Sequence, residues 1–490
     1  MTQLTAPQAF HEAQRLIRMG EYARASGLTG QLFQNIPDEP AIRGLHGIAT
    51  ARMGLPEKGL GLLTEACEKA GDQKVRPFLL AEKAHVLRSL NRASEALEAA
   101  RAAREADAEN QDALASVVEA LVDLGQFDEA RSTLPEAKET EAATIAAARG
   151  RLALLAGRPD DGADALATAT ERVGVAAFEL EIMLRLLGQL RERQGRYEDA
   201  WKAYRRATKL RRTKYDPGAH RAMVNELIAG WTPGAMGKIQ RSDLDGSRVV
   251  MPIGLPGSGH DLVERIVARH SRGQGAGELL ALGRVARAGM GAVQKSFRHV
   301  VAKPNMLKGK QLRQGGQAYL AQIDDLNLKA ARVVDSNVLN VYLAGLAPLM
   351  LSGMHVVMCV RDPAEAAFAW HTSIPGPQHP YAQDPGEQMD HAADVLRLCD
   401  HWCGLFTSMG VRVHEFSFER FADAPEVEAR ALIEGIGLDF EPACTQPHLP
   451  AKTRMGTTDL ARLPTSQWAR RYGHFSGMLK PGFELPTVRA

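Results

Sequence analysis

The sequence predicts an α-helical repeat solenoid followed by a three-layer α/β domain that has a mostly parallel sheet and a P-loop-like turn. Three observations support this fold class: the length, a recurring turn pattern in the first half, and a strand, glycine-rich turn and helix in the second. A chain of 490 residues can form two or more cores, because single domains usually have about 100–200 residues. We therefore expect helical repeats over 1–215, a linker over 216–246 and the α/β domain over 247–490.

The balance of charges excludes some classes of partner. Sixty Lys and Arg residues face 58 Asp and Glu residues, so the formal net charge is only +2. No overall field would draw the protein to nucleic acid or to a membrane surface. The first residues lack a basic segment followed by an apolar one, and no apolar run approaches about 18 residues. We expect a soluble cytoplasmic protein.

The five cysteines are too few and too scattered for a disulfide framework, which fits a reducing compartment. Cys399 and Cys403 lie four residues apart on an expected helix. A metal site there would need ligands from elsewhere, such as His391, His401 or His414. Small buried apolar side chains are the simpler interpretation, and we predict no metal.

A repeat with a period of about one helical hairpin runs through the first half. A Gly or Asn followed by polar residues and then Ala or Gly recurs at intervals of 34, 37, 34, 32 and 38 residues, with amphipathic runs on both sides. These turns begin at Gly20, Gly54, Asn91, Gly125, Gly157 and Gly195. Glycine allows the chain to leave one helix through a left-handed conformation. The pattern resembles the tetratricopeptide repeat.

The resemblance implies that successive hairpins stack into a solenoid with a concave groove, which suits a protein or peptide partner. A spacer or a dimerisation platform is the alternative. The basic run from Lys202 to Lys214 could be mistaken for a nucleic-acid patch. We interpret it as a solvated helix end, where cations are favourable.

A strand, a glycine-rich turn and a helix are predicted from Ser247 to His270. Free backbone N–H groups at the start of such a helix face an anion in many phosphate sites. The turn is not the GxxxxGK[ST] loop of nucleotide triphosphatases, because His260 and Asp261 follow its last glycine.

The loop resembles the 5′-phosphosulfate loop of sulfotransferases, GxPRSGTTLxxxxLxxH, which binds 3′-phosphoadenosine-5′-phosphosulfate (PAPS). The residues that fit are Gly254, Pro256, Ser258, Gly259, Leu262 and His270. Gly257 replaces the basic residue of the pattern, and His260 and Asp261 replace its two threonines.

Further motifs follow in the family's order as far as Leu485. Gly277-Glu278 matches the Gly-Glu pair of bacterial repeat-linked sulfotransferases and of the tyrosylprotein enzymes. A DKxPxN element, an RDPxDxxxS element and a C-terminal lid match through residues that are retained here, namely Asp335, Asn340, Arg361, Asp362, Pro363, Arg454, Trp468 and Tyr472. Ser336 stands where the family has Lys, and Ala369 where it has the serine that contacts the 3′-phosphate.

The resemblance implies a site for PAPS without a metal. The catalytic residue that it implies is Glu278, as general base. His260, which replaces a threonine of the pattern, is a second candidate, because it could be protonated beside a phosphosulfate and act as a cation or acid. The implied donor-binding residues are Pro256, Gly257, Ser258, Gly259, His260, Asp261, Arg361 and Arg454.

Each of these residues also has an ordinary structural interpretation. Glu278 could be an acid in the first turn of a helix, and Ser258 could cap the loop helix. Arg361 could pair with Asp362 or a helix end instead of a phosphate. His270 is better explained as a helix-end residue than as a catalyst.

The departures from the family pattern weaken the case for sulfuryl transfer. The reaction needs cations and hydrogen-bond donors for the transferred group, and a base for the acceptor. Losing one donor aimed at developing charge costs about 100- to 1,000-fold in rate, and the loop and DK cations are both absent. Asp261 would also repel a dianionic donor.

Two functions therefore remain open. One is sulfuryl transfer from PAPS to a protein or glycan hydroxyl recruited by the repeats. The other is a catalytically inactive scaffold that acts through the groove.

Overall fold

The structure is a computed structural model that describes residues 6–18, 21–71, 73–90, 92–138, 141–210, 214–289, 304, 307–326, 329–373, 379–447 and 451. The chain divides after Leu210 into two compact units. Of the helices in these ranges, none combines the length and the apolar character needed to cross a bilayer.

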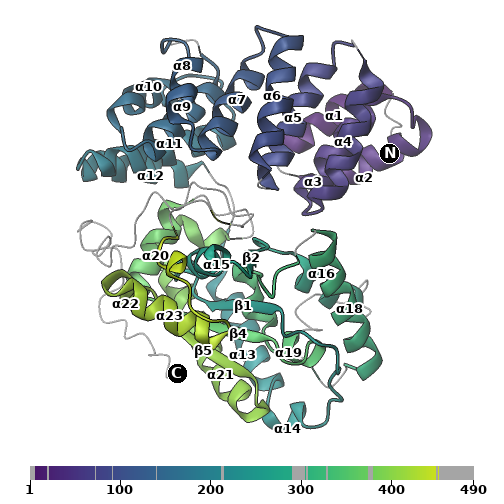
Figure 1. The fold of residues 1–490 in the computed structure, drawn as a ribbon, viewed down its shortest axis with the longest axis vertical. Helices are drawn as coiled ribbons and strands as arrows, with labels where there is room; N and C mark the ends of the chain where they lie inside the picture. Colours follow the sequence, from purple (N-terminus) through teal and green to yellow (C-terminus); the bar gives the residue numbers. More distant parts are fainter. Residues whose placement is uncertain are drawn as a thin grey trace. The chain divides into compact units, whose positions relative to one another are not determined.

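The N-terminal unit consists of helices that pack against their neighbours in chain order (Figure 1). Four of the predicted turn glycines, Gly54, Gly125, Gly157 and Gly195, have φ of 82°, 72°, 68° and 72°. Each lies between the two helices of a pair, as predicted; Gly20 and Asn91 lie outside the described residues. The helices are α1 (Ala6–Arg18), α2 (Tyr22–Asn35), α3 (Pro40–Arg52), α4 (Pro56–Ala70), α5 (Arg76–Ser89), α6 (Ala93–Ala106), α7 (Gln111–Asp123), α8 (Phe127–Thr133), α9 (Ala143–Leu155), α10 (Asp160–Thr170), α11 (Ala177–Arg193) and α12 (Tyr197–Lys209).

Ion pairs join equivalent helices of successive repeats. Arg88 on α5 contacts Glu119 and Asp123 on α7 at 2.5 and 2.6 Å, and Arg151 on α9 contacts the same two acids at 2.5 and 2.6 Å. Although burial opposes it, the two guanidinium groups lower the pKa of Asp123. The partners lie 28 to 35 residues apart, so the charges follow the repeat period.

The C-terminal unit contains a five-stranded parallel sheet in the order β2-β3-β1-β4-β5 (Figure 1). Alternate residues of β1 enter different cores: Val249 and Met251 pack in one apolar cluster and Val250 in another. Helices cover both faces, which confirms the predicted three-layer α/β architecture. The strands are β1 (Val249–Gly254), β2 (Gly273–Gly275), β3 (Arg332–Val334), β4 (His355–Val360) and β5 (Arg412–Ser417).

The helices of this unit are α13 (Pro217–Gly230), α14 (Pro233–Met236), α15 (His260–Arg269), α16 (Ala281–Gly289), α18 (Gly309–Asp325), α19 (Ala347–Met350), α20 (Pro363–Thr372), α21 (Pro385–Met409), α22 (Phe418–Asp423) and α23 (Pro425–Gly435), with 3₁₀ turns η2 (Val338–Leu343), η3 (Pro380–Gln383) and η4 (Pro442–Thr445).

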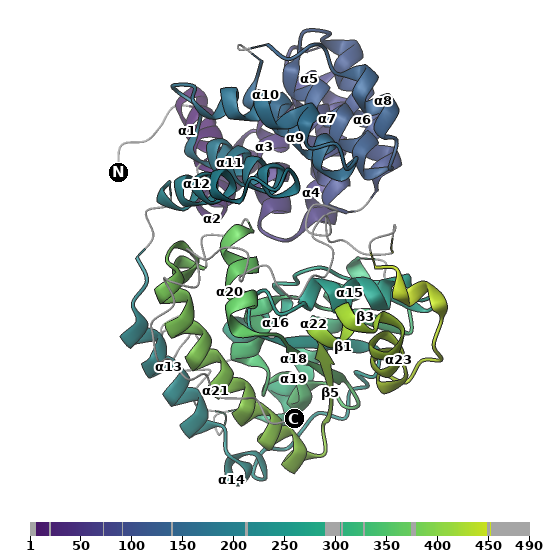
Figure 2. The ribbon, with the colours of Figure 1, turned by 90° about the vertical axis from the view of Figure 1, so that its left-hand side faces the viewer.

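The segment predicted as a linker, 216–246, is instead part of this unit. Its helix α13 runs alongside α21 (Figure 2). Trp231 is 1% exposed in the same core as β1 and contacts Trp402 edge-on. The Pro and Gly residues that suggested a linker begin helices here: Pro217 and Pro233 occupy first-turn positions, where proline is tolerated.

Close helix packing in the repeats predicts the effect of two alanine substitutions. A Cβ atom at Gly188 would lie 2.4 Å from the ring of Tyr204, whereas one at Gly61 would meet no atom within 4 Å. We expect Gly188→Ala to destabilise the protein by about 1–3 kcal/mol through overpacking. Gly61→Ala should be neutral or stabilising by up to about 1 kcal/mol. Urea denaturation monitored by circular dichroism compares the two, and equal effects would contradict this packing.

Candidate functional site

The predicted strand, turn and helix are present around the glycine-rich loop. Strand β1 ends at Gly254 and α15 begins at His260. Gly254, Gly257 and Gly259 have φ of 154°, 85° and 109°, a region that side chains other than glycine rarely adopt. The conformation directs the first amides of α15 toward the loop, as an anion site requires.

Helix α20 packs directly on Gly257. A Cβ atom at this position would lie 2.3 Å from the carbonyl oxygen of Ala366 and 3.3 Å from the amide nitrogen of Trp370. Backbone atoms cannot move aside as a flexible side chain can. The loop therefore has no room for the basic side chain that the sulfotransferase pattern carries here.

Two buried polar side chains of the loop lack hydrogen-bond partners among the described residues. Ser258 is 0% and His260 3% exposed, and neither the Ser258 Oγ nor either ring nitrogen of His260 makes a hydrogen bond. The interpretation of Ser258 as the cap of α15 is wrong, since no side chain caps that helix. Buried polar groups without partners are costly, so this is where an anion or water would be accommodated.

The hypothesis that His260 is a cation does not fit its environment. Burial lowers the pKa of His260 to about 4, so its imidazole is neutral near pH 7. Asp261, the second residue of α15, is partly exposed beside it. The start of this helix thus carries one anionic side chain and no cation of its own.

Arg361 follows β4 and binds the loop itself. Its Nη1 atom donates a hydrogen bond to the carbonyl oxygen of Gly257 at 2.8 Å, and its guanidinium lies 3.7 Å from the ring centroid of Phe418. Asp362 instead accepts hydrogen bonds from the Ala364 and Glu365 amides at the start of α20. The strand-end position that we predicted for Arg361 is confirmed. One of the guanidinium N–H donors of Arg361 is already used by the Gly257 carbonyl.

Ser336, which stands at the position of the family's DK lysine, faces a carboxylate. Its hydroxyl donates to Glu264 on α15, a side chain that is 0% exposed. Glu264 also accepts a hydrogen bond from the Gly277 amide at 3.1 Å. Ser336 and Glu264 thus connect the start of the Gly277-Glu278 segment to the loop helix without supplying a positive charge.

Asp335 lies beside this pair in a fully buried position. Burial raises the pKa of Asp335 to about 6, although hydrogen bonds from the Tyr319 hydroxyl and from backbone amides oppose the shift. The Tyr319 hydroxyl donates to the carboxylate at 2.8 Å, and the Leu279 amide donates at 3.2 Å. Asp335 therefore acts as a structural acceptor that orders the chain after Glu278.

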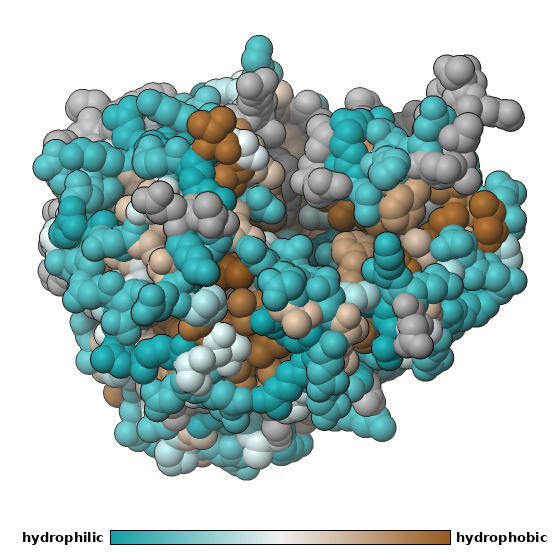
Figure 3. All heavy atoms as spheres, turned by 90° about the horizontal axis from the view of Figure 1, so that it is seen from above, coloured by the Kyte–Doolittle hydropathy of each residue, from teal (hydrophilic) through white to brown (hydrophobic). Residues whose placement is uncertain are grey.

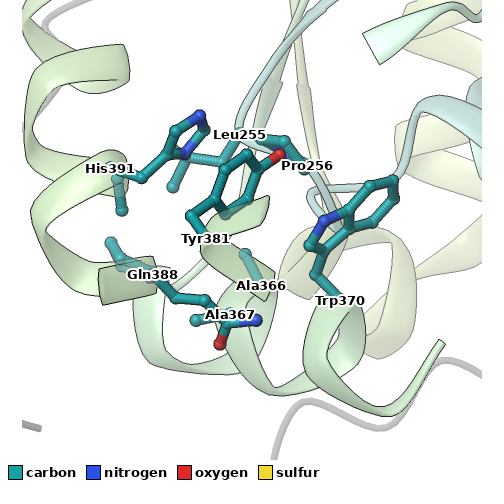
Figure 4. Close-up of a pocket in the computed structure, with 10 residues that line it drawn as sticks. Leu255, Pro256, Ala366, Ala367, Trp370, Tyr381, Gln388 and His391 are labelled. Carbon is teal, nitrogen blue, oxygen red and sulfur yellow. The ribbon is translucent and has the colours of Figure 1, made fainter. Parts of the chain in front are cut away.

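A small pocket lies beside the loop (Figure 4). It leaves about 240 Å³ of space between atoms, part of it open to solvent, and its enclosed part has room for about one water molecule. Tyr381 lies between His391 and Trp370 in Figure 4. The pocket is lined by Leu255, Pro256, Pro363, Ala366, Ala367, Trp370, Tyr381, Gln388, His391 and Ala392.

Glu278 lies within electrostatic range of this pocket. Burial is the main cause of the raised pKa of Tyr381, and the carboxylate of Glu278 contributes to it. Glu278 is exposed and precedes α16 by three residues. It is not in the first turn of a helix, so the alternative interpretation of this residue is wrong.

The remaining predicted residues divide into three groups. His270 ends α15 and contacts the Asp439 carbonyl at 2.8 Å, which confirms its structural interpretation. Cys399 and Cys403 are buried on α21, and no cluster of metal-ligating side chains occurs in the described ranges. Arg454, like Trp468 and Tyr472, lies outside the described residues.

Sequence reasoning missed the pocket and the packing of α20. Gln388 and His391 are three residues apart, a spacing that places both on one face of a helix, and this signal could have indicated them. No sequence signal marks the contact between Gly257 and Ala366, because it joins backbone atoms 109 residues apart.

The comparisons with known proteins agree with this geometry. Residues 250–442 match the model of the Sulfotransferase family, a range that contains the loop, Glu278 and Arg361. An uncharacterized protein of Aquifex aeolicus (strain VF5) is 24% identical over 268 residues, which cover 52% of this chain and 34% of that protein. The chain thus spans about a third of the length of this curated relative.

Two solved structures are similar to parts of the chain at low identity. The sulfotransferase domain of the Synechococcus PCC 7002 olefin synthase is 11% identical and covers 51% of this chain and 94% of its own, with a TM-score of 0.34. The C-terminal part of a TPR repeat-containing protein from Cytophaga hutchinsonii is 13% identical and covers 45% and 84%, with a TM-score of 0.29. The protein is a helical-repeat chain with a sulfotransferase-like C-terminal domain.

The environment of Asp335 gives a pH-dependent prediction. Its pKa of about 6 exceeds the ordinary 3.8, so its protonated form contributes stability that is complete below about pH 4 and is lost as the pH rises through 6. Tyr319→Phe removes a donor and raises this pKa further. We expect a loss of about 1–3 kcal/mol in unfolding free energy at pH 7.5, and a smaller loss at pH 5.

Urea denaturation at the two pH values measures this difference. Tyr215→Phe is the matched control, because the buried Tyr215 hydroxyl has no hydrogen-bond partner in the described ranges. A Tyr319→Phe effect that is the same at both pH values would contradict the assignment.

Proposed function

We propose that this protein acts chiefly by binding: its repeats hold a protein or peptide partner, and its sulfotransferase-like domain transfers sulfuryl groups from PAPS weakly or not at all. The observation that carries the proposal is the contact of Gly257 with α20. The Ala366 carbonyl occupies the space where a loop cation would begin. The cation is therefore excluded by the fold as well as absent from the sequence.

The second missing cation strengthens this proposal. Ser336 is hydrogen-bonded to the buried side chain of Glu264, so an acidic side chain, and no cation, lies beside the position where the family has lysine. Each lost donor costs about 100- to 1,000-fold, or roughly 2.7–4 kcal/mol of transition-state stabilisation. Two such losses leave little of the family's rate.

The helical repeats supply the binding surface in this account. A repeat array presents an extended face made of equivalent helices. One face of the molecule is mostly hydrophilic, with apolar residues in small groups (Figure 3). At the connection of α10 to α11, Val173 and Phe178 are 101% and 57% exposed, and we place them on the proposed partner surface.

Sulfuryl transfer to a protein or glycan hydroxyl is the second candidate. The unpartnered Ser258 and His260 side chains and the free amides of α15 favour it, because they suit the 5′-phosphosulfate of PAPS. Glu278, near the pocket, would be the base. The residues thus fit the anionic part of PAPS, but they do not supply the charges that its transfer chemistry needs.

A transfer assay with ³⁵S-labelled PAPS and a mixed peptide and glycan acceptor pool distinguishes the two functions. We expect the wild-type protein to release or transfer no more label than the Glu278→Gln variant does. Turnover by the wild type that falls at least 100-fold in Glu278→Gln would refute the binding proposal and favour the transferase.

Replacing the lost cation should also fail. Gly257→Arg places a side chain against α20 at a positive φ, and we expect a loss of at least about 2 kcal/mol in stability with no gain in nucleotide affinity. Gly404→Arg is the control, because a side chain at that exposed α21 position meets no atom within 4 Å. Differential scanning calorimetry compares them, and a Gly257→Arg protein as stable as the control would contradict the closed loop.

A further inference from the structure

Basic residues gather at the amino ends of the parallel strands. Arg332 begins β3, His355 begins β4 and Arg412 begins β5, and Arg272 comes directly before β2. The strands of a parallel sheet all begin at one edge, whereas the glycine-rich loop follows the carboxyl end of β1. These residues therefore lie at the edge of the sheet opposite to the loop. We call Arg272, Arg332, His355, Arg412 and His414 the amino-edge cluster.

The cluster residues of β3, β4 and β5 share one face of the sheet, because successive residues of a strand point to opposite faces. The strand residues that alternate with them on this face pack in one apolar core, and are Val334, Val357 and Phe416. In the pairing of β4 with β5, His355 lies opposite Arg412. Helix α23 packs in the same core, and a Cβ atom at Gly435 would lie 2.7 Å from Nδ1 of His414. The cluster thus adjoins the C-terminal end of α23.

Arg332 is held by this helix end. Its Nε atom donates to the Ile436 carbonyl at 2.5 Å and its Nη1 atom to the Ala331 carbonyl at 2.8 Å. Its Nη2 atom lies 3.5 Å from the Gly437 carbonyl. Cations are favourable at the C-terminal end of a helix, so Arg332 has a structural role. A guanidinium has five N–H donors, and two of them are left for a further acceptor.

The same structural role does not account for Arg272 and Arg412. Both are exposed, and neither side chain makes a hydrogen bond or an ion pair within the described ranges. Burial is the main cause of the lowered pKa of Arg332, and repulsion from Arg272 and Arg412 adds to it, while Asp245 opposes the shift. Three guanidinium groups therefore lie within electrostatic range of one another, and like charges held together cost stability.

The two histidines of the cluster are in contact. Nδ1 of His355 lies 3.4 Å from Nε2 of His414, and His355 is 1% exposed. Burial is the main cause of their lowered pKa values, and Arg412 contributes to both shifts; the pKa of His355 falls to about 4. Both rings are therefore mostly neutral near pH 7. An anion beside them would raise their pKa values again, so these rings can report its binding.

We propose that the amino-edge cluster binds a dianionic tetrahedral group, phosphate or sulfate, between Arg412 and the free donors of Arg332, with Arg272 adding to the positive field. The planar guanidinium fork matches the oxygens of such a group, and the anion offsets the repulsion among the three cations. The site lies at the other edge of the sheet from the glycine-rich loop and does not depend on it. A negative result for PAPS would leave it unaffected.

Nitrogen-15 NMR of the full chain labelled at histidine tests the site. Sodium phosphate is titrated at pH 7.5 against sodium chloride of equal ionic strength, and His414→Gln identifies the signals of His414. We expect phosphate, and likewise sulfate, to shift these signals saturably in the millimolar range and to raise the pKa of His414, whereas chloride should not. Glycerol 3-phosphate distinguishes the source of the group: tighter binding than phosphate indicates an ester, and equal or weaker binding the free anion.

Variants separate this site from a structural role. Arg412→Gln should abolish the phosphate response and Arg272→Gln should weaken it several-fold. Arg205→Gln on α12 is the matched control, because Arg205 is also exposed and without an ion pair in the described part of the chain. Since Arg412 is repelled by its neighbours, its removal should leave the urea midpoint unchanged or raise it. No saturable shift, a shift that chloride reproduces, or an Arg412→Gln protein that still responds or has a lower urea midpoint would overturn the proposal.

Discussion

The contact between the glycine-rich loop and α20 is the constraint on which the functional account depends. Gly257 has a positive φ and lies against the backbone of α20, and its carbonyl accepts a hydrogen bond from Arg361. These two contacts of Gly257 fix the loop: the hydrogen bond uses one N–H donor of Arg361, and the packing on α20 leaves no room for a basic side chain. The amides that begin α15 keep their direction, so the site retains the shape of an anion cradle without its positive charge.

Two buried acidic side chains, Glu264 and Asp335, lie close to this cradle and bind the chain around it. Glu264 binds Ser336 and the Gly277 amide, and Asp335 binds Tyr319 and the Leu279 amide. These contacts order the segment that carries Glu278. A sulfotransferase uses lysine in this region to stabilise leaving charge; here the same positions stabilise the fold.

Much of the fold was predictable because it depends on local patterns. Turn glycines at one repeat spacing predicted the helical pairs, and an apolar run followed by glycines predicted β1 and α15. The linker was wrong because Pro217 and Pro233 begin helices as readily as they break them, and the burial of Trp231 depends on α21, far away in sequence. Ser258 and Arg361 were placed correctly on the loop and at the strand end. The partner of Arg361 could not be predicted, since it is the backbone carbonyl of Gly257, 104 residues away in the sequence.

The central claim is that the loop has lost the positive site of a PAPS-binding enzyme. Isothermal titration of the protein with 3′-phosphoadenosine-5′-phosphate, beside the Arg361→Ala variant, tests it most directly. The account predicts no heat, or an affinity no better than millimolar that changes little in the variant. Micromolar binding by the wild type, abolished by Arg361→Ala, would contradict it and show that Arg361 leaves the Gly257 carbonyl to bind the nucleotide.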